Sequence, residues 1–80
     1  MKPLSELQKN QPAKIINFDR IKIGDSHITE LLELGFYPGA IVECLDASVY
    51  LNKMILLVGG TKVALRLSDC HHINVSEEPK

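Results

Sequence analysis

The side chains of this chain that could bind a metal are few and scattered. They are Cys44 and Cys70 with His27, His71 and His72. In an extended strand Cys70 and His72 would point to the same side, because side chains alternate along a strand. Two ligands make half of a stable zinc site, which takes four at defined spacing. We therefore expect no resident metal or cofactor, and only weak, adventitious or interface-bridging metal binding at Cys70 and His72.

Residues that could catalyse a reaction also lack the context that catalysis needs. None of the serines lies in a nucleophile elbow of the G-x-S-x-G type. The acidic residues form no recognisable pair for general acid and base chemistry. Gly59-Gly60-Thr61-Lys62 resembles a phosphate loop, but the first glycine, the spacer and the following helix are missing. We expect no enzymatic activity.

Length and charge narrow the function classes further. Eighty residues make one domain over positions 1–80, with a core from about 4 to 75 and a polar C-terminal tail. A formal charge of −1 and only two arginines argue against nucleic acid as a partner, including a small RNA-binding barrel. Without a long apolar run or a signal peptide, we expect a cytoplasmic chain that does not insert into membranes. In that reducing compartment both cysteines are expected to be free and buried.

A short helix close to residues 26–34 is predicted by the spacing of its apolar side chains. Ile28, Leu31 and Leu32 recur at i, i+3 and i+4. Ser26 stands where its hydroxyl can cap the start of the helix.

The end of this helix and the turn that follows are marked by glycine and proline. Gly35 stands where a helix closes in a left-handed conformation. Pro38 and Gly39 suit the centre of a type II turn. The chain should then reverse into a strand over residues 40–47.

The clearest pair of strands comprises residues 53–58 and 61–67. Gly59-Gly60 between them predicts a two-residue hairpin, which places Leu56 opposite Val63 on one apolar face. Further strands are predicted at 13–18 and 72–75. The expected fold is mainly β, a closed or nearly closed barrel of about five antiparallel strands with one short helix. Its predicted interior contains Val42, Leu56, Val63, Leu65 and Ile73.

Several of these residues together resemble the FeoA family. The run Leu31-Leu32-x-Leu34-Gly35-x-x-Pro38-Gly39-x-x-Val42 precedes a Leu65-Arg66 strand end and a closing Ile73-x-Val75. Members of that family are small cytoplasmic accessories of the bacterial ferrous iron transporter. The resemblance implies an SH3-like barrel that docks on the cytoplasmic G-protein part of the transporter FeoB and regulates it. Thr29-Glu30 departs from the basic residues that members often carry before the Leu-Leu pair.

One alternative function and one question of assembly remain beside this interpretation. The alternative function is a metal-responsive module like the SH3-like C-terminal domain of iron-dependent repressors, although the chain has no helix-turn-helix. Assembly stays open because small barrels with exposed strand edges can form weak homo-oligomers.

A partner surface is predicted from aromatic and aliphatic side chains in two connections. Phe36 and Tyr37 follow the helix, and Tyr50 and Leu51 lie in the next loop. Aromatic side chains supply much of the binding energy at interfaces, so we expect these residues to form one patch at one end of the domain. The alternative docking face is the less buried side of the hairpin, with Ile55, Leu57 and Arg66.

Overall fold

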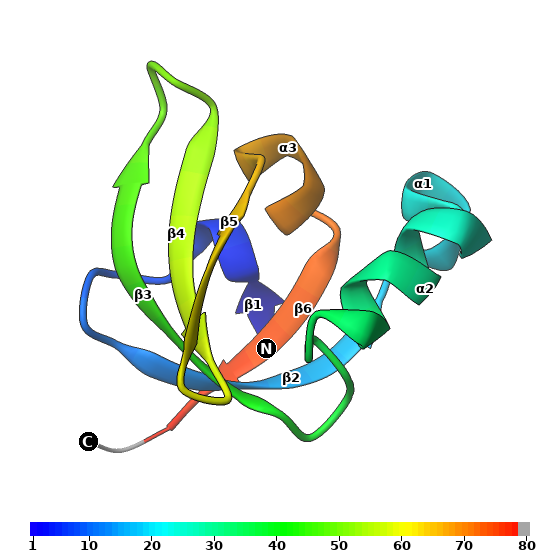
Figure 1. Ribbon diagram of the computed structural model, residues 1–80, viewed down its shortest axis with the longest axis horizontal. Helices are drawn as coiled ribbons and strands as arrows, with labels where there is room; N and C mark the ends of the chain where they lie inside the picture. The colour runs from blue at the N-terminus through cyan, green and yellow to red at the C-terminus, as the bar shows by residue number, and fades with distance from the viewer. Residues whose placement is uncertain (79–80) are drawn as a thin grey trace.

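The computed structural model describes residues 1–78, which form a six-stranded antiparallel sheet and several short helices (Figure 1). The strands are β1 (Lys2–Pro3), β2 (Pro12–Phe18), β3 (Ile41–Ser48), β4 (Lys53–Val58), β5 (Thr61–Leu65) and β6 (Ile73–Glu77). They are arranged in the order β1-β6-β2-β3-β4-β5. The helices are the 3-10 helix η1 (Leu4–Glu6), α1 (Arg20–Ile23), α2 (Asp25–Glu33) and α3 (Leu67–Cys70).

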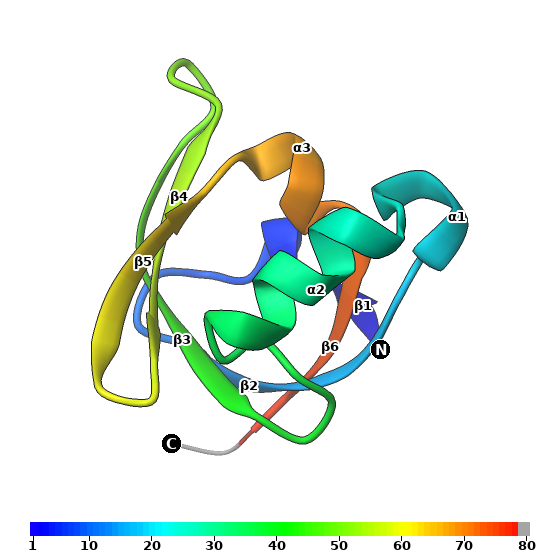
Figure 2. The same cartoon turned by 45° about the vertical axis from the view of Figure 1, so that its right-hand side comes forward.

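The fold is mainly β with antiparallel strands, as predicted, but the strongly curved sheet is not closed and has six strands, where we expected a closed or nearly closed barrel of about five. Within residues 1–78, β1 and β5 form the two edges and do not pair with each other. The unexpected strand β1 pairs only with β6, through Lys2 and Pro3. A proline has no N–H to donate, so such a strand cannot extend its ladder further. Figure 2 shows the hairpin of β4 and β5 standing apart from β1.

The predicted β4–β5 hairpin is confirmed residue by residue. Gly59 and Gly60 both have positive φ, 56° and 79°, as a type I′ turn requires. The register pairs Leu56 with Val63 and Met54 with Leu65. The second strand ends at Leu65, two residues earlier than expected, because Leu67 begins α3.

The core lies inside the curve of the sheet. Val42, Leu56 and Ile73 are fully buried there, as predicted, whereas Val63 and Leu65 pack against the core only in part. Both belong to the edge strand β5, which has no neighbour on its outer side in the described part of the chain. The largest fully buried side chains are Phe36, Leu4, Ile15, Met54, Leu56, Ile73, Val42, Val75, Cys44 and Cys70.

Helix α2 occupies the predicted position, but the predicted cap is wrong. The helix begins at Asp25 and no side chain caps it, so Ser26 already lies inside the first turn. The residue before the helix is Gly24, which joins α2 to the unexpected helix α1 and has a positive φ of 88°. Ile28 and Leu31 are buried, while Leu32 is partly exposed.

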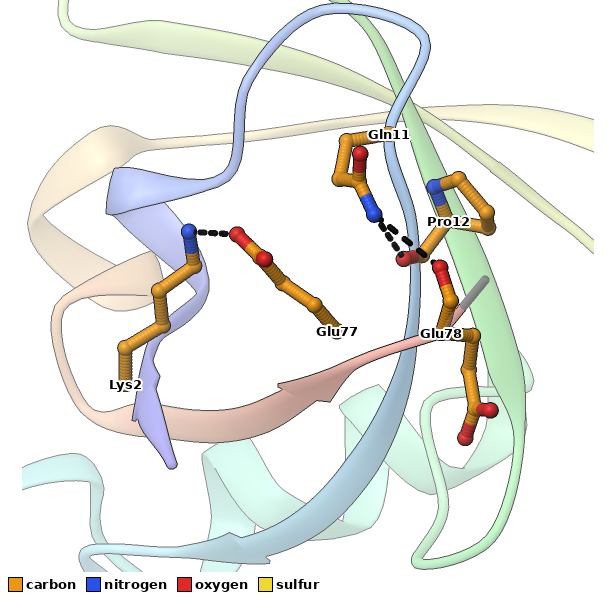
Figure 3. A network of polar contacts seen from close by, with 5 residues as sticks. All are labelled: Lys2, Gln11, Pro12, Glu77 and Glu78. Carbon is orange, nitrogen blue, oxygen red and sulfur yellow. Dashed lines mark hydrogen bonds and ion pairs between the residues drawn. The ribbon is translucent and has the colours of Figure 1, made fainter. Parts of the chain in front are cut away.

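The C-terminal segment is a strand, not a polar tail. Ser76 and Glu77 belong to β6, and the Glu78 N–H donates to Pro12 O at 3.0 Å. Figure 3 shows the Gln11 side-chain amide bonding the Pro12 and Glu78 carbonyls, beside an ion pair of Lys2 with Glu77. Residues 79 and 80 of the predicted tail lie outside the described residues. None of the helices in the described part of the chain has the length and hydropathy that crossing a bilayer requires.

Replacing Leu56 by Ala should lower the free energy of unfolding by about 2–5 kcal/mol, because the residue is fully buried and leaves a cavity. The matched control is Ile21→Ala, which truncates an aliphatic side chain that is 95% exposed and should change stability by less than about 0.5 kcal/mol. Urea unfolding at constant m-value measures both. Equal effects of the two substitutions would contradict the assigned core.

Candidate functional site

The connection between α2 and β3 holds its side chains in fixed directions. The Gly35 N–H donates to Leu32 O at 3.1 Å and the Phe36 N–H to Leu31 O at 2.9 Å, the two bonds of a Schellman motif. Gly35 has a φ of 100°, which a residue with a side chain rarely adopts. The following Phe36 is fully buried, so the chain is anchored one residue before Tyr37.

A type II turn follows at once and points Tyr37 outward. Gly39 has a φ of 94°, and the Ala40 N–H donates to Tyr37 O at 2.9 Å. The turn is tied to β2 because the Gly39 N–H donates to Ile15 O at 2.7 Å. As a result the Tyr37 side chain is 53% exposed on a rigid base.

A groove of about 480 Å³ opens beside this turn. We call it the helix-end groove; it is lined by Glu33, Leu34, Gly35, Tyr37, Ala40, Ile41, Val58, Gly59 and Thr61. Leu34, Tyr37 and Ile41 are each about half exposed around it. The groove thus combines a concave shape with an apolar rim, the combination that accepts apolar side chains of a partner.

The loop between β3 and β4 exposes a second apolar group, which we call the loop tip (Val49, Tyr50 and Leu51). Tyr50 is 96% exposed, the highest value of any large apolar side chain in residues 1–78. The loop is nevertheless well anchored, since the Leu51 N–H donates to Ser48 Oγ at 3.1 Å. Asn52, with a φ of 51°, receives hydrogen bonds from the backbone N–H groups at the start of α3.

The prediction of one patch built from both connections is wrong. Figure 1 shows the β3–β4 loop at one end of the sheet and the α2–β3 connection at the other. The six residues of β4 hold the two ends roughly 17 Å apart. Phe36, predicted to share in the surface, is fully buried and contributes nothing to it. The exposed members are Tyr37 in the helix-end groove and Tyr50 and Leu51 in the loop tip.

Arg66 lies after β5, not on it. It occupies the position before α3, where its Nε is 3.3 Å from Asp69 Oδ2. Its side chain is largely exposed, so this ion pair contributes little to stability.

Cys70 and His72, the pair considered for weak metal binding, do not lie on one face of a strand as expected. Cys70 belongs to α3, not to a strand, and is fully buried, so it does not share an open face with His72. Burial raises the pKa of the Cys70 thiol to about 12, with smaller contributions from Asp69 and Cys44. Burial also raises the pKa of Cys44. Both cysteines are therefore protonated at neutral pH, and a protonated thiol is a poor metal ligand.

No three His, Cys, Asp or Glu side chains within residues 1–78 are grouped to hold a metal ion. One polar contact was not foreseen from the sequence. Ser5 Oγ lies 2.6 Å from His71 Nδ1 and joins η1 to α3. The two residues are far apart in the chain, and neither stands in a motif that would have indicated the pair.

The family model of the FeoA domain matches residues 2–77. An iron uptake regulatory protein named FeoA has a similar structure, with 22% identity, a TM-score of 0.81 and 96% coverage of both chains. No curated protein matches the chain.

Two further solved structures are similar. FeoA of Stenotrophomonas maltophilia complexed with zinc, described as a prokaryotic SH3 domain protein, is 27% identical with a TM-score of 0.80 and covers 95% of this chain and 91% of its own. ScaR with bound Zn²⁺ is 17% identical with a TM-score of 0.82, and the match covers 98% of this chain and 37% of ScaR.

Stability should fall at alkaline pH because of Cys70. The folded thiol has a pKa of about 12, above the value near 9 expected in the unfolded chain, so only the unfolded state ionises between these values. The unfolding free energy should be unaffected by this thiol below about pH 9 and then decline by up to about 1.4 kcal/mol per pH unit. Denaturant titrations of wild type and Cys70→Ala measure the difference in slope. Parallel pH profiles would contradict the assigned burial.

Proposed function

This chain belongs to the FeoA family, and from that premise we propose that it is an accessory protein of bacterial ferrous iron transport. The observation that carries the proposal is the family match, which extends over residues 2–77 and includes every described strand. The relative from Stenotrophomonas maltophilia is described as a candidate activating factor of bacterial ferrous iron transport. We infer a role of that kind for this chain.

The proposed mechanism is docking without chemistry. The thiols are buried and protonated. Within the described residues, the Ser5–His71 pair has no third side chain that would orient the histidine as a catalytic base. An accessory protein of this kind acts by binding one conformation of its partner more tightly than another and so shifting the population.

The proposed partner is the cytoplasmic G-protein part of the transporter FeoB, and the proposed docking surface is the helix-end groove. Leu34, Tyr37 and Ile41 supply an apolar rim, which partner side chains can bury. The Schellman motif and the type II turn hold this rim in place before binding, which lowers the entropy cost of association. The loop tip, with Tyr50 and Leu51, is the competing docking surface.

Replacing Tyr37 by Asp should weaken binding to the isolated cytoplasmic domain of FeoB at least about ten-fold, since a charge would enter the apolar rim. The unfolding free energy should change by less than about 0.5 kcal/mol because the side chain is largely exposed. Calorimetric titration and urea unfolding measure the two quantities.

The matched control is Tyr50→Asp, the same substitution at the exposed tip on the opposite end of the sheet. It should leave the affinity for the FeoB domain unchanged. If Tyr50→Asp abolished binding while Tyr37→Asp did not, docking would belong to the loop tip. If neither variant lost affinity, both surfaces would be rejected.

A second candidate function is that of a metal-responsive module, favoured by the zinc complex of the Stenotrophomonas maltophilia relative. The fold shared with ScaR is compatible with it. In this chain, however, the cysteines are fully buried, which leaves the histidines and carboxylates of the surface as ligands.

Zinc should not remain bound at an equimolar ratio after chelator treatment and buffer exchange, because the described ligands do not converge. Metal analysis of the exchanged protein measures this. Retention of one zinc per chain, lost in His72→Ala but not in His27→Ala, would favour the metal-responsive module instead.

A further inference from the structure

Strand β4 is apolar on both of its faces, although only one face contacts the core. Met54, Leu56 and Val58 alternate inward and are buried. Ile55 and Leu57 alternate outward, remain half-buried, and belong neither to the core cluster nor to the side chains packed against it. The solvent side of an antiparallel sheet is normally polar, so this outer side has the composition of a surface that becomes covered.

No element of residues 1–78 covers this side. In Figures 1 and 2 the helices α1, α2 and α3 all lie toward the concave side of β3, β4 and β5. We call the opposite side the outer face; its residues are Glu43 and Asp46 on β3, Ile55 and Leu57 on β4, and Lys62 and Ala64 on β5.

The strand register orders these residues in rows that cross the sheet. Glu43 pairs with Leu57, and Leu57 pairs with Lys62, so one row reads acid, apolar, base. In the described residues neither Glu43 nor Lys62 has an ion-pair partner. The two charged residues lie about 10 Å apart, one on each side of the central strand.

We propose that the outer face binds a second copy of this chain in a two-fold symmetric dimer. Rotation by 180° about an axis parallel to β4 brings the two faces together with Leu57 against Leu57 of the second copy. The same rotation reverses the acid-to-base direction of the row. Each Glu43 then lies opposite the Lys62 of the other copy, and each Ala64 lies opposite Asp46 of the other copy. A surface that is complementary to itself is what a two-fold interface requires.

The size of the outer face and the residues at its rim determine how strongly the two copies are expected to associate. Three strands spaced about 4.8 Å apart and about five residues long give a face of roughly 15 by 17 Å, which is well below the roughly 800 Å² that each partner buries in a standard interface. Lys53 lies at the end of β4, at the rim of the face, where its long stem can keep the ammonium group in water. The dimer should therefore be weak and reversible. The proposed dimer does not depend on the proposed function, since the helix-end groove with Tyr37 is not part of the outer face.

Sedimentation equilibrium of the full chain over micromolar to millimolar concentration tests the dimer. Wild type should show reversible monomer–dimer association, and Leu57→Lys should weaken it more than about ten-fold. Glu43→Lys and Lys62→Glu should each weaken it roughly five- to ten-fold, because each places like charges opposite one another. The double variant Glu43→Lys with Lys62→Glu should restore association close to wild type.

Matched controls are Glu30→Lys on α2 and Lys22→Glu on α1, which reverse the same charges on exposed positions away from the sheet. They should leave association unchanged. Circular dichroism of every variant establishes that it is folded.

A wild-type chain that stays monomeric at millimolar concentration would overturn the dimer. So would a double variant no better than the single ones. If the chain were monomeric and Leu57→Lys instead abolished binding to the FeoB domain, the outer face would belong to that partner and not to a second copy. Loss of FeoB binding in Tyr37→Asp alone leaves the dimer expectation intact, so the two proposals fail separately.

Discussion

Ile15 on β2 is the residue at which the segment after α2 and the C-terminal strand β6 come together. Its side chain is fully buried, and both of its backbone polar groups bond the segment that follows α2. On one edge its N–H donates to Ala40 O at 2.9 Å and its carbonyl accepts from Gly39, which holds the turn after α2 against the sheet. On the other edge it pairs with Val75 of β6. Because a buried backbone group without a partner is costly, the two bonds hold the helix–turn segment against β2. The register with Val75 places the C-terminal strand on the other edge of β2.

Local turn chemistry explains why part of the fold could be predicted from the sequence. Gly59-Gly60, Gly35 and Gly39 each adopt the positive φ that their positions require, and the elements beside them lie where expected. In contrast, β2 carries an irregularity between Ile15 and Asn17, so that Ile15 is buried and Phe18 also packs against the core, while the unpaired Ile16 is exposed. Such a bulge depends on the partner strand and not on the local sequence.

The candidate site shows the same division between local and long-range information. Two aromatic residues follow Gly35, and the pattern alone does not tell which ring fills the core; the Schellman geometry buries Phe36 and leaves Tyr37 outside. The position of the loop tip could have been foreseen. A single strand, β3, connects the turn at Pro38 to the loop, and one passage of a strand must carry the chain to the opposite end of the sheet. No comparable sequence pattern predicts helix α3, which places Cys70 in the core.

The pairing of β1 with β6 has a consequence for how the chain folds. Lys2 lies opposite Val75, so the first and last strands close a loop of nearly the full chain length. Leu4, just after β1, belongs to the same fully buried core as Ile73 and Val75. Contacts of such sequence separation form late, because the loop-closure entropy must be overcome before they stabilise anything. During synthesis the N-terminal segment must therefore wait until β6 has left the ribosome, and the core is completed only after translation of the domain has ended.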